Sequence, residues 1–168
     1  MNILAFCNLK KYNIKKLYFY YTLRTQKAMI KDYTTILINL SNLPKTQIHG
    51  ELKDFSNKAK GKYELIWASN DAGFAKELPF RRMVMKRRFS KTFFGESIDV
   101  FLPSLSFFDY ILDNLKKSPQ ECIYIDTDVK NLLAAEEVGL SPILFDIGNE
   151  HYCGMDIRSF DELWNIIG

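Results

Sequence analysis

The chain has 168 residues, of which 47% are hydrophobic and 26% charged, and its formal net charge is +3. This is ordinary composition for one globular domain with its own core. No apolar run reaches the roughly 18 residues of a membrane span, and the three widely spaced cysteines, Cys7, Cys122 and Cys153, fit no metal site. An odd number of cysteines outside any framework indicates reduced thiols and a cytoplasmic protein.

Residues 1–33 are predicted to form a basic, aromatic N-terminal extension. Residues 1–31 contain seven lysines and arginines and no acid, and residues 17–21 are apolar and largely aromatic. A helix that packs its aromatic side on the domain and a segment that lies on a membrane or nucleic acid both stay open. The absence of serine and the single arginine argue against a transit peptide.

From residue 34 onward, short apolar runs alternate with helical patterns. Runs of strand length, too short for a typical helix, lie at residues 35–40, 63–68, 98–102, 122–125 and 142–145. Apolar residues at helical spacing predict helices over 104–117 and 128–138, and the capping-box spacing of Ser159 and Glu162 predicts a last helix. We therefore expect an α/β domain over residues 34–168 with a parallel sheet, helices on both faces and ligands at the carboxyl ends of the strands.

Two further features depend on local composition. Residues 81–88 carry five positive charges in eight positions, which fits either phosphate contacts on nucleic acid or a solvated face. Cys122 precedes three apolar residues of the fourth predicted strand, so we expect a reduced, buried thiol there.

Residues 118–140 carry the most specific pattern in the chain. A predicted buried strand ends at Asp126 and Asp128, and the helix that follows contains Asn131, Ala134, Ala135 and Gly139. This stretch resembles the fourth motif of the haloacid dehalogenase (HAD) superfamily of hydrolases and phosphatases. Ser69-Asn70, after the second predicted strand, resembles the second motif, and Leu102-Pro103-Ser104 resembles the third.

Residues 36–43, which include Asn39 and Ser41, resemble the first motif of that family. The resemblance covers about residues 34–168 and implies a Rossmann-like sheet of five strands in the order 5-4-1-2-3. Because only residues 42–62 separate the first two motifs, it also implies little or no cap domain and an open site.

The residues at the chemical positions depart from the family pattern. The resemblance places a nucleophilic aspartate at Asn39, an acid/base aspartate at Ser41 and a charge-compensating lysine at Leu102. An amide is a very poor nucleophile, and a serine without a base partner does not replace a carboxylic acid in proton transfer. The resemblance therefore implies a pseudoenzyme with no catalytic residue in place, either a phosphatase-derived binding protein or a vestigial one.

Binding residues are retained in part. Ser69 and Asn70 are expected to bind phosphate, and Asp126 and Asp128 to form a weak Mg²⁺ site. For Asp128 the competing role is the N-cap of the helix over residues 129–138. The expected ligand is an unidentified protein or a phosphorylated molecule.

Two other functions stay open. The first is an active Mg²⁺-dependent phosphohydrolase whose nucleophile lies elsewhere in the chain. The first motif could also lie at residues 2–9, but these residues lack aspartate as well. The second alternative is a nucleic-acid-binding module that uses residues 81–88.

Overall fold

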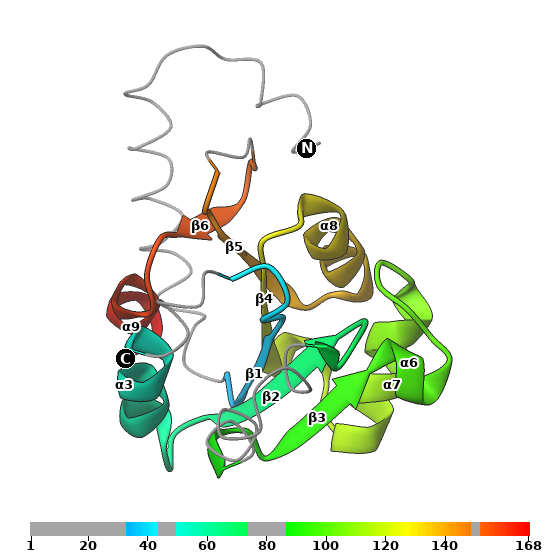
Figure 1. Cartoon of the computed structure of the whole chain (residues 1–168), viewed down its shortest axis with the longest axis horizontal. Coiled ribbons are helices and arrows are strands. Elements are labelled where there is room, and N and C mark those ends of the chain that lie inside the picture. The colour runs from blue at the N-terminus through cyan, green and yellow to red at the C-terminus, as the bar shows by residue number, and fades with distance from the viewer. Residues whose placement is uncertain (1–32, 44–49, 74–86, 149–151) are drawn as a thin grey trace. The chain divides into compact units, whose positions relative to one another are not determined.

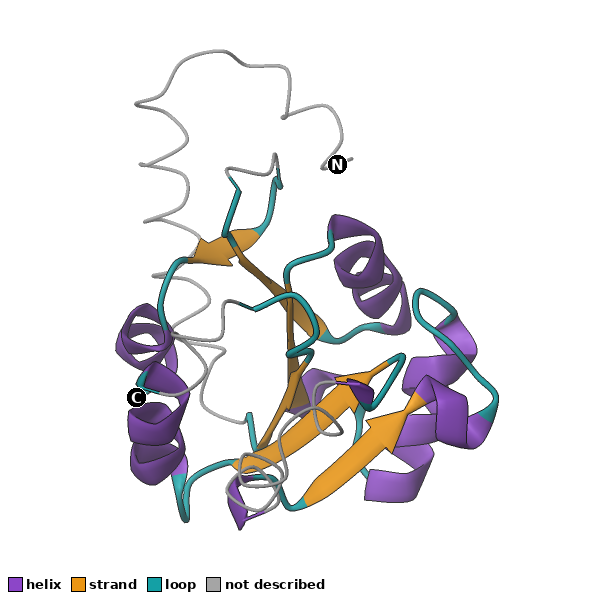
Figure 2. Ribbon diagram, viewed as in Figure 1, coloured by secondary structure: helices purple, strands orange, loops and turns teal. Residues whose placement is uncertain are grey.

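The computed structural model describes residues 33–43, 50–73, 87–148 and 152–168. They belong to one compact unit, a parallel sheet with helices on both faces (Figures 1 and 2). The predicted extension up to residue 32, the alternative first motif and residues 81–86 of the basic run lie outside the described residues. None of the helices in the described part of the chain is long and apolar enough to cross a membrane.

The sheet has six strands in the order β3-β2-β1-β4-β5-β6. They are β1 (Thr35–Ile38), β2 (Glu64–Ser69), β3 (Lys91–Phe94), β4 (Cys122–Asp126), β5 (Ser141–Phe145) and β6 (Met155–Ile157). All five neighbouring pairs are parallel. Read from β5 to β3, this is the predicted order 5-4-1-2-3. The predicted count of five strands is wrong, because β6 adds a sixth strand beside β5.

Helices cover both faces of this sheet, as predicted. They are α3 (Glu51–Ala59), α6 (Gly95–Ile98), α7 (Leu105–Leu115), α8 (Val129–Val138) and α9 (Phe160–Ile167), with a 3₁₀ turn η3 at Pro119–Glu121. Apolar side chains of α3 and α9 pack on one face, and those of α7 and α8 pack on the other (Figure 1). The described residues 50–62, between the first two motifs, form α3 and its connection to β2, so they belong to a covering layer.

The central strand β1 shows why the buried strands could be predicted from the sequence. Ile36 and Ile38 point to the α3 and α9 layer, whereas Leu37 points to the α7 and α8 layer. All four residues of the strand are buried. Apart from Thr35 its residues are apolar, as expected for a strand covered on both faces, and this is the pattern that predicted it.

The third strand lies elsewhere than the sequence predicts. The predicted strand at residues 98–102 is wrong, since these residues follow β3 as the end of α6 and a loop with Asp99 at φ 54°. The observed strand β3 lies at the sheet edge, where Lys91 and Thr92 are exposed and Phe93 is buried. This edge strand is polar only in its first half, and the more apolar run that follows it belongs to the end of α6 and to the loop that carries Leu102.

Local capping explains where two helices begin. The Asp128 side chain accepts a hydrogen bond from the Lys130 backbone N–H at 2.8 Å, which makes it the N-cap of α8. Ser159 Oγ accepts from the Glu162 N–H at 3.1 Å, as predicted for α9. The Glu162 carboxylate accepts from the Arg158 N–H, one residue before the position that a full capping box requires.

Cys122 is a free, buried cysteine, which confirms the prediction for this residue. Its thiol lies 3.5 Å from the Ser118 carbonyl oxygen, and burial raises its pKa to about 11.

The Cys122 thiol should react slowly with a bulky thiol reagent in the folded protein. Because the thiolate is the reactive form, its raised pKa alone lowers the rate at pH 8 by roughly 100-fold relative to the unfolded chain, and burial lowers it further. Peptide mass spectrometry after timed labelling, with and without urea, measures the rate at Cys122 itself. Equal rates in the two conditions would contradict a buried thiol.

Candidate functional site

The carboxyl ends of the central strands bring the predicted site residues together. Asn39 follows β1, and its side-chain Nδ2 donates to Asp126 Oδ2, at the end of β4, over 3.0 Å. Ser41 Oγ lies 2.5 Å from Ser69 Oγ, at the end of β2. The predicted convergence of Asn39, Ser41, Ser69 and Asp126 is confirmed by these two contacts.

The Asp126 carboxylate is the centre of a buried hydrogen-bond network. Asp126 is 1% exposed. Its Oδ2 accepts from Asn39 Nδ2, from the Tyr124 hydroxyl at 2.5 Å and from Asn131 Nδ2 at 2.8 Å. Its Oδ1 accepts from the backbone N–H groups of Thr127 at 2.6 Å and Asp128 at 3.0 Å. We call these six residues the Asp126 cluster.

Burial and hydrogen bonding act on this carboxyl in opposite directions. Burial raises the pKa of Asp126, while the hydrogen bonds from Tyr124, Asn131, Asn39 and the Asp128 N–H oppose the rise. Burial and the nearby carboxylate also raise the pKa of Tyr124 well above its ordinary value, so the phenol stays a donor. Neutral donors therefore satisfy Asp126, without a cation.

Asn39 is held at both ends of its amide. While Nδ2 donates to Asp126, Oδ1 accepts from the Ser41 backbone N–H at 3.1 Å. The position where the resemblance expects a nucleophile thus carries a neutral group with both polar atoms engaged. Such an amide neither attacks phosphorus nor carries a negative charge for a metal ion.

The residues expected to bind phosphate are engaged within the protein. Ser69 is fully buried and its hydroxyl meets Ser41. Asn70 Oδ1 accepts from the Leu102 backbone N–H at 2.6 Å, and Asn70 Nδ2 donates to the Leu102 carbonyl at 3.3 Å. These contacts fix the loop of the third motif beside the second. A phosphate-binding role for Ser69 and Asn70 stays a prediction.

The expected magnesium ligands do not fit a metal site as they stand. The described residues contain no group of three or more His, Cys, Asp or Glu side chains placed to hold a metal ion. Both oxygens of Asp126 accept hydrogen bonds, and Asp128 is an exposed N-cap with one oxygen bonded to the Lys130 N–H. No step of chemistry is therefore assigned to Mg²⁺ here.

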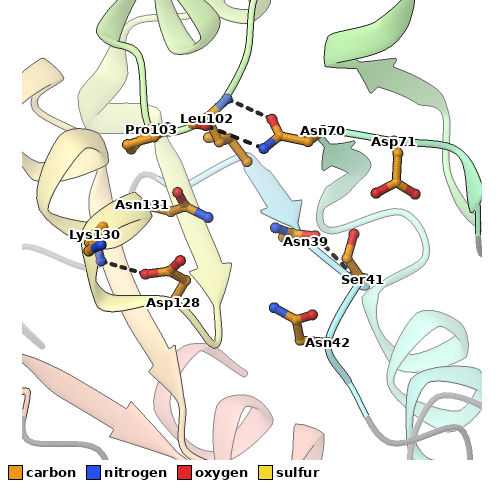
Figure 3. A pocket seen from close by; sticks show the side chains of 10 residues that line it. All are labelled: Asn39, Ser41, Asn42, Asn70, Asp71, Leu102, Pro103, Asp128, Lys130 and Asn131. Carbon is orange, nitrogen blue, oxygen red and sulfur yellow. Dashed lines mark hydrogen bonds between the residues drawn. The ribbon is translucent and has the colours of Figure 1, made fainter.

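A pocket of about 410 Å³ opens at this edge of the sheet (Figure 3). Segments after β1 and β2, the third-motif loop and the first turn of α8 line it, with residues Asn39, Ser41, Asn42, Asn70, Asp71, Leu102, Pro103, Asp128, Lys130 and Asn131. Figure 3 shows Asn39, Ser41 and Asn42 on one side of the pocket and Asp128, Lys130 and Asn131 on the other.

Sequence reasoning missed part of this site. Asn42, Asp71 and Lys130 each lie within two residues of a predicted site residue, so extending the search past each strand end would have found them. Tyr124 precedes Asp126 by two residues, and the two-residue period of a strand places both side chains on one face. That spacing is the signal for Tyr124 as a partner of Asp126.

No protein-family model matches the chain. Solved structures do resemble it. A HAD family enzyme from Bacteroides thetaiotaomicron, in complex with magnesium and inorganic phosphate, is 16% identical with a TM-score of 0.57, and the match covers 70% of this chain and 96% of that one. A HAD-superfamily hydrolase of subfamily IA from Geobacter sulfurreducens is 10% identical with a TM-score of 0.62, covering 80% and 99%.

A 2-haloacid dehalogenase from Pseudomonas syringae is 14% identical with a TM-score of 0.62, and the match covers 72% of this chain and 53% of that one. At such identities the likeness concerns the fold. It agrees with a parallel sheet that is covered by helices on both faces. The chain therefore has a HAD-like fold.

Proposed function

We propose that this HAD-like domain is a non-catalytic binding domain, whose ligand enters the pocket at the strand ends. The main support for this proposal is the 3.0 Å hydrogen bond from Asn39 Nδ2 to Asp126 Oδ2. It supports the proposal because the nucleophile position holds an amide donor and because the remaining buried acid is satisfied by protein groups. The Ser41 hydroxyl and the Leu102 side chain supply neither the acid/base nor the cation that phosphoryl transfer requires.

We expect no Mg²⁺-dependent phosphate release from p-nitrophenyl phosphate and no halide release from a 2-haloacid. Millimolar Mg²⁺ should shift the melting temperature by less than about 1 °C, because a cation that does not bind the native state does not stabilise it. Steady-state assays and melting curves, each with Mg²⁺ or EDTA, measure these effects.

Contaminating activity is separated by a variant of the same chain. Phosphate or halide release that EDTA abolishes, and that also disappears in an Asn39→Ala protein, would identify this chain as a hydrolase and overturn the proposal. Release that is equal in the parent and in this variant comes from another protein.

The remaining expectations stay predictions. A nucleic-acid-binding role for residues 81–88 would appear as salt-dependent retention on heparin. Of the described residues in this run, Arg88 donates through Nε to Ser56 Oγ at 3.1 Å, a contact within the domain. The cytoplasmic location and the boundary of the N-terminal extension also stay predictions.

A further inference from the structure

We infer that the pocket takes a neutral, polyhydroxylated ligand such as a sugar ring, and that it does so without a metal ion. This inference rests on the proposed binding function and names the class of ligand. It is supported by the charges that line the pocket, by the donors and acceptors left open there and by a small apolar patch.

The charges of the pocket disfavour an anion. Two carboxylates, Asp71 and Asp128, and one ammonium group, Lys130, are among its lining residues. The buried Asp126 carboxyl lies behind Asn39 and Asn131, which donate to it. Among the described residues of the lining, a phosphate dianion would meet more negative than positive charge, and these residues offer no set of carboxylates for a bridging cation.

The open polar atoms match hydroxyl groups. Asp71 Oδ1 accepts from the Gly73 N–H at 2.7 Å, and Asp128 Oδ1 accepts from the Lys130 N–H at 2.8 Å. One oxygen of each carboxylate is thus used locally, and the other accepts no hydrogen bond from the described part of the chain. The exposed Asn42 amide adds two donors and an acceptor. A hydroxyl both donates and accepts, so a ring of hydroxyls can pair with such a mixed lining.

Two residues of the third-motif loop add a small apolar patch to a lining whose other residues are polar. Leu102 and Pro103 line the pocket, and the two hydrogen bonds between Asn70 and the Leu102 backbone fix their loop. The C–H face of a sugar ring can pack on such a surface while its hydroxyls meet the polar lining. A volume of about 410 Å³ lies within the range of small-molecule sites.

The test is an NMR titration of the ¹⁵N-labelled, full-length chain in the presence of EDTA. The probes are methyl glycosides of common aldohexoses and, separately, inorganic phosphate with EDTA or with Mg²⁺ in its place. At least one glycoside should give saturable shifts of the side-chain amide signals of Asn42 and Asn131, with tighter binding than phosphate in either condition.

Two asparagine variants locate the binding. Asn42→Ala should weaken glycoside binding roughly 3- to 10-fold, the effect of losing one hydrogen bond. Asn114→Ala should leave it unchanged. Asn114 is an exposed α7 residue whose carbonyl accepts from the side chain of Lys91, the first residue of β3, so it lies at the opposite edge of the sheet.

The outcomes separate this inference from the proposed function. The inference would be overturned if phosphate bound more tightly than every glycoside, or if no glycoside changed the NMR signals of the pocket residues. This holds even if the hydrolase assays detect no product. Glycoside binding together with EDTA-sensitive phosphate release would support the ligand class and overturn the non-catalytic role.

Discussion

An Asn39→Asp substitution is expected to lower the free energy of unfolding by about 2–4 kcal/mol at pH 7 when divalent cations are absent. The change replaces a 3.0 Å hydrogen bond to Asp126 with two carboxylates that face each other in a buried place. Millimolar Mg²⁺ should recover part of the loss, because two adjacent carboxylates favour a divalent cation between them. Urea denaturation in EDTA and in Mg²⁺ measures both effects.

An Asn39→Ala protein is the matched control, since it removes the same donor without adding charge. At pH 7 we expect the aspartate variant to be the less stable of the two. The added carboxyl is buried beside a like charge, so its pKa in the folded state lies above its unfolded value. The folded state then binds more protons, and the stability of the aspartate variant falls as pH rises through that raised pKa. If the two variants differed in their free energy of unfolding by the same amount at pH 4 and at pH 7, charge repulsion would be contradicted as the cause.

The Asp126→Asn substitution should cost about 3–5 kcal/mol, the largest effect expected from a single conservative change in this chain. The carboxylate accepts five hydrogen bonds, three at Oδ2 and two at Oδ1. An amide offers one oxygen, so its NH₂ group must face either three donors or two backbone N–H groups. Some donors lose their partner inside the protein, where each costs about 1–3 kcal/mol.

The same substitution two residues away is the control. Asp128 is exposed and caps α8 through one oxygen, and asparagine is as good an N-cap as aspartate. Asp128→Asn should therefore change the free energy of unfolding by less than about 0.5 kcal/mol in the same urea titration. Equal losses for the two substitutions would mean that removing a negative charge, and not the hydrogen-bond network, sets the stability.

The buried central strands of this fold could be predicted from the sequence, whereas the strands at the sheet edges could not. β1 and β4 are buried along their whole length, so their residues are apolar except Thr35 at the start of β1 and Asp126 at the end of β4. β3 lies at an edge with Lys91 and Thr92 exposed, and β6 has three residues, of which Asp156 is exposed. Such short, partly exposed strands carry no pattern that distinguishes them from loops, so their pairing depends on the sheet that already exists.

The candidate site shows a similar division. Positions at strand ends could be predicted, because parallel strands bring their carboxyl ends to one edge, and Asn39 and Asp126 do meet there. The partners of Asp126 could not all be predicted, since the orientation of the Asn131 amide depends on how α8 packs beside β4. The order of the polar residues gives their location, whereas tertiary packing determines which atoms are left open for a ligand.

The Asp126 cluster also bears on the order in which the native contacts form. Asn39 and Asp126 are separated by 87 positions along the chain, so their hydrogen bond requires β1 and β4 to have paired across a long loop. β1 pairs with β2 across a much shorter stretch, from Ile38 to Glu64. We therefore expect the cluster to become complete late in folding. Its stabilisation then acts mainly on the lifetime of the folded protein, by slowing unfolding, and contributes little to the rate at which the chain folds.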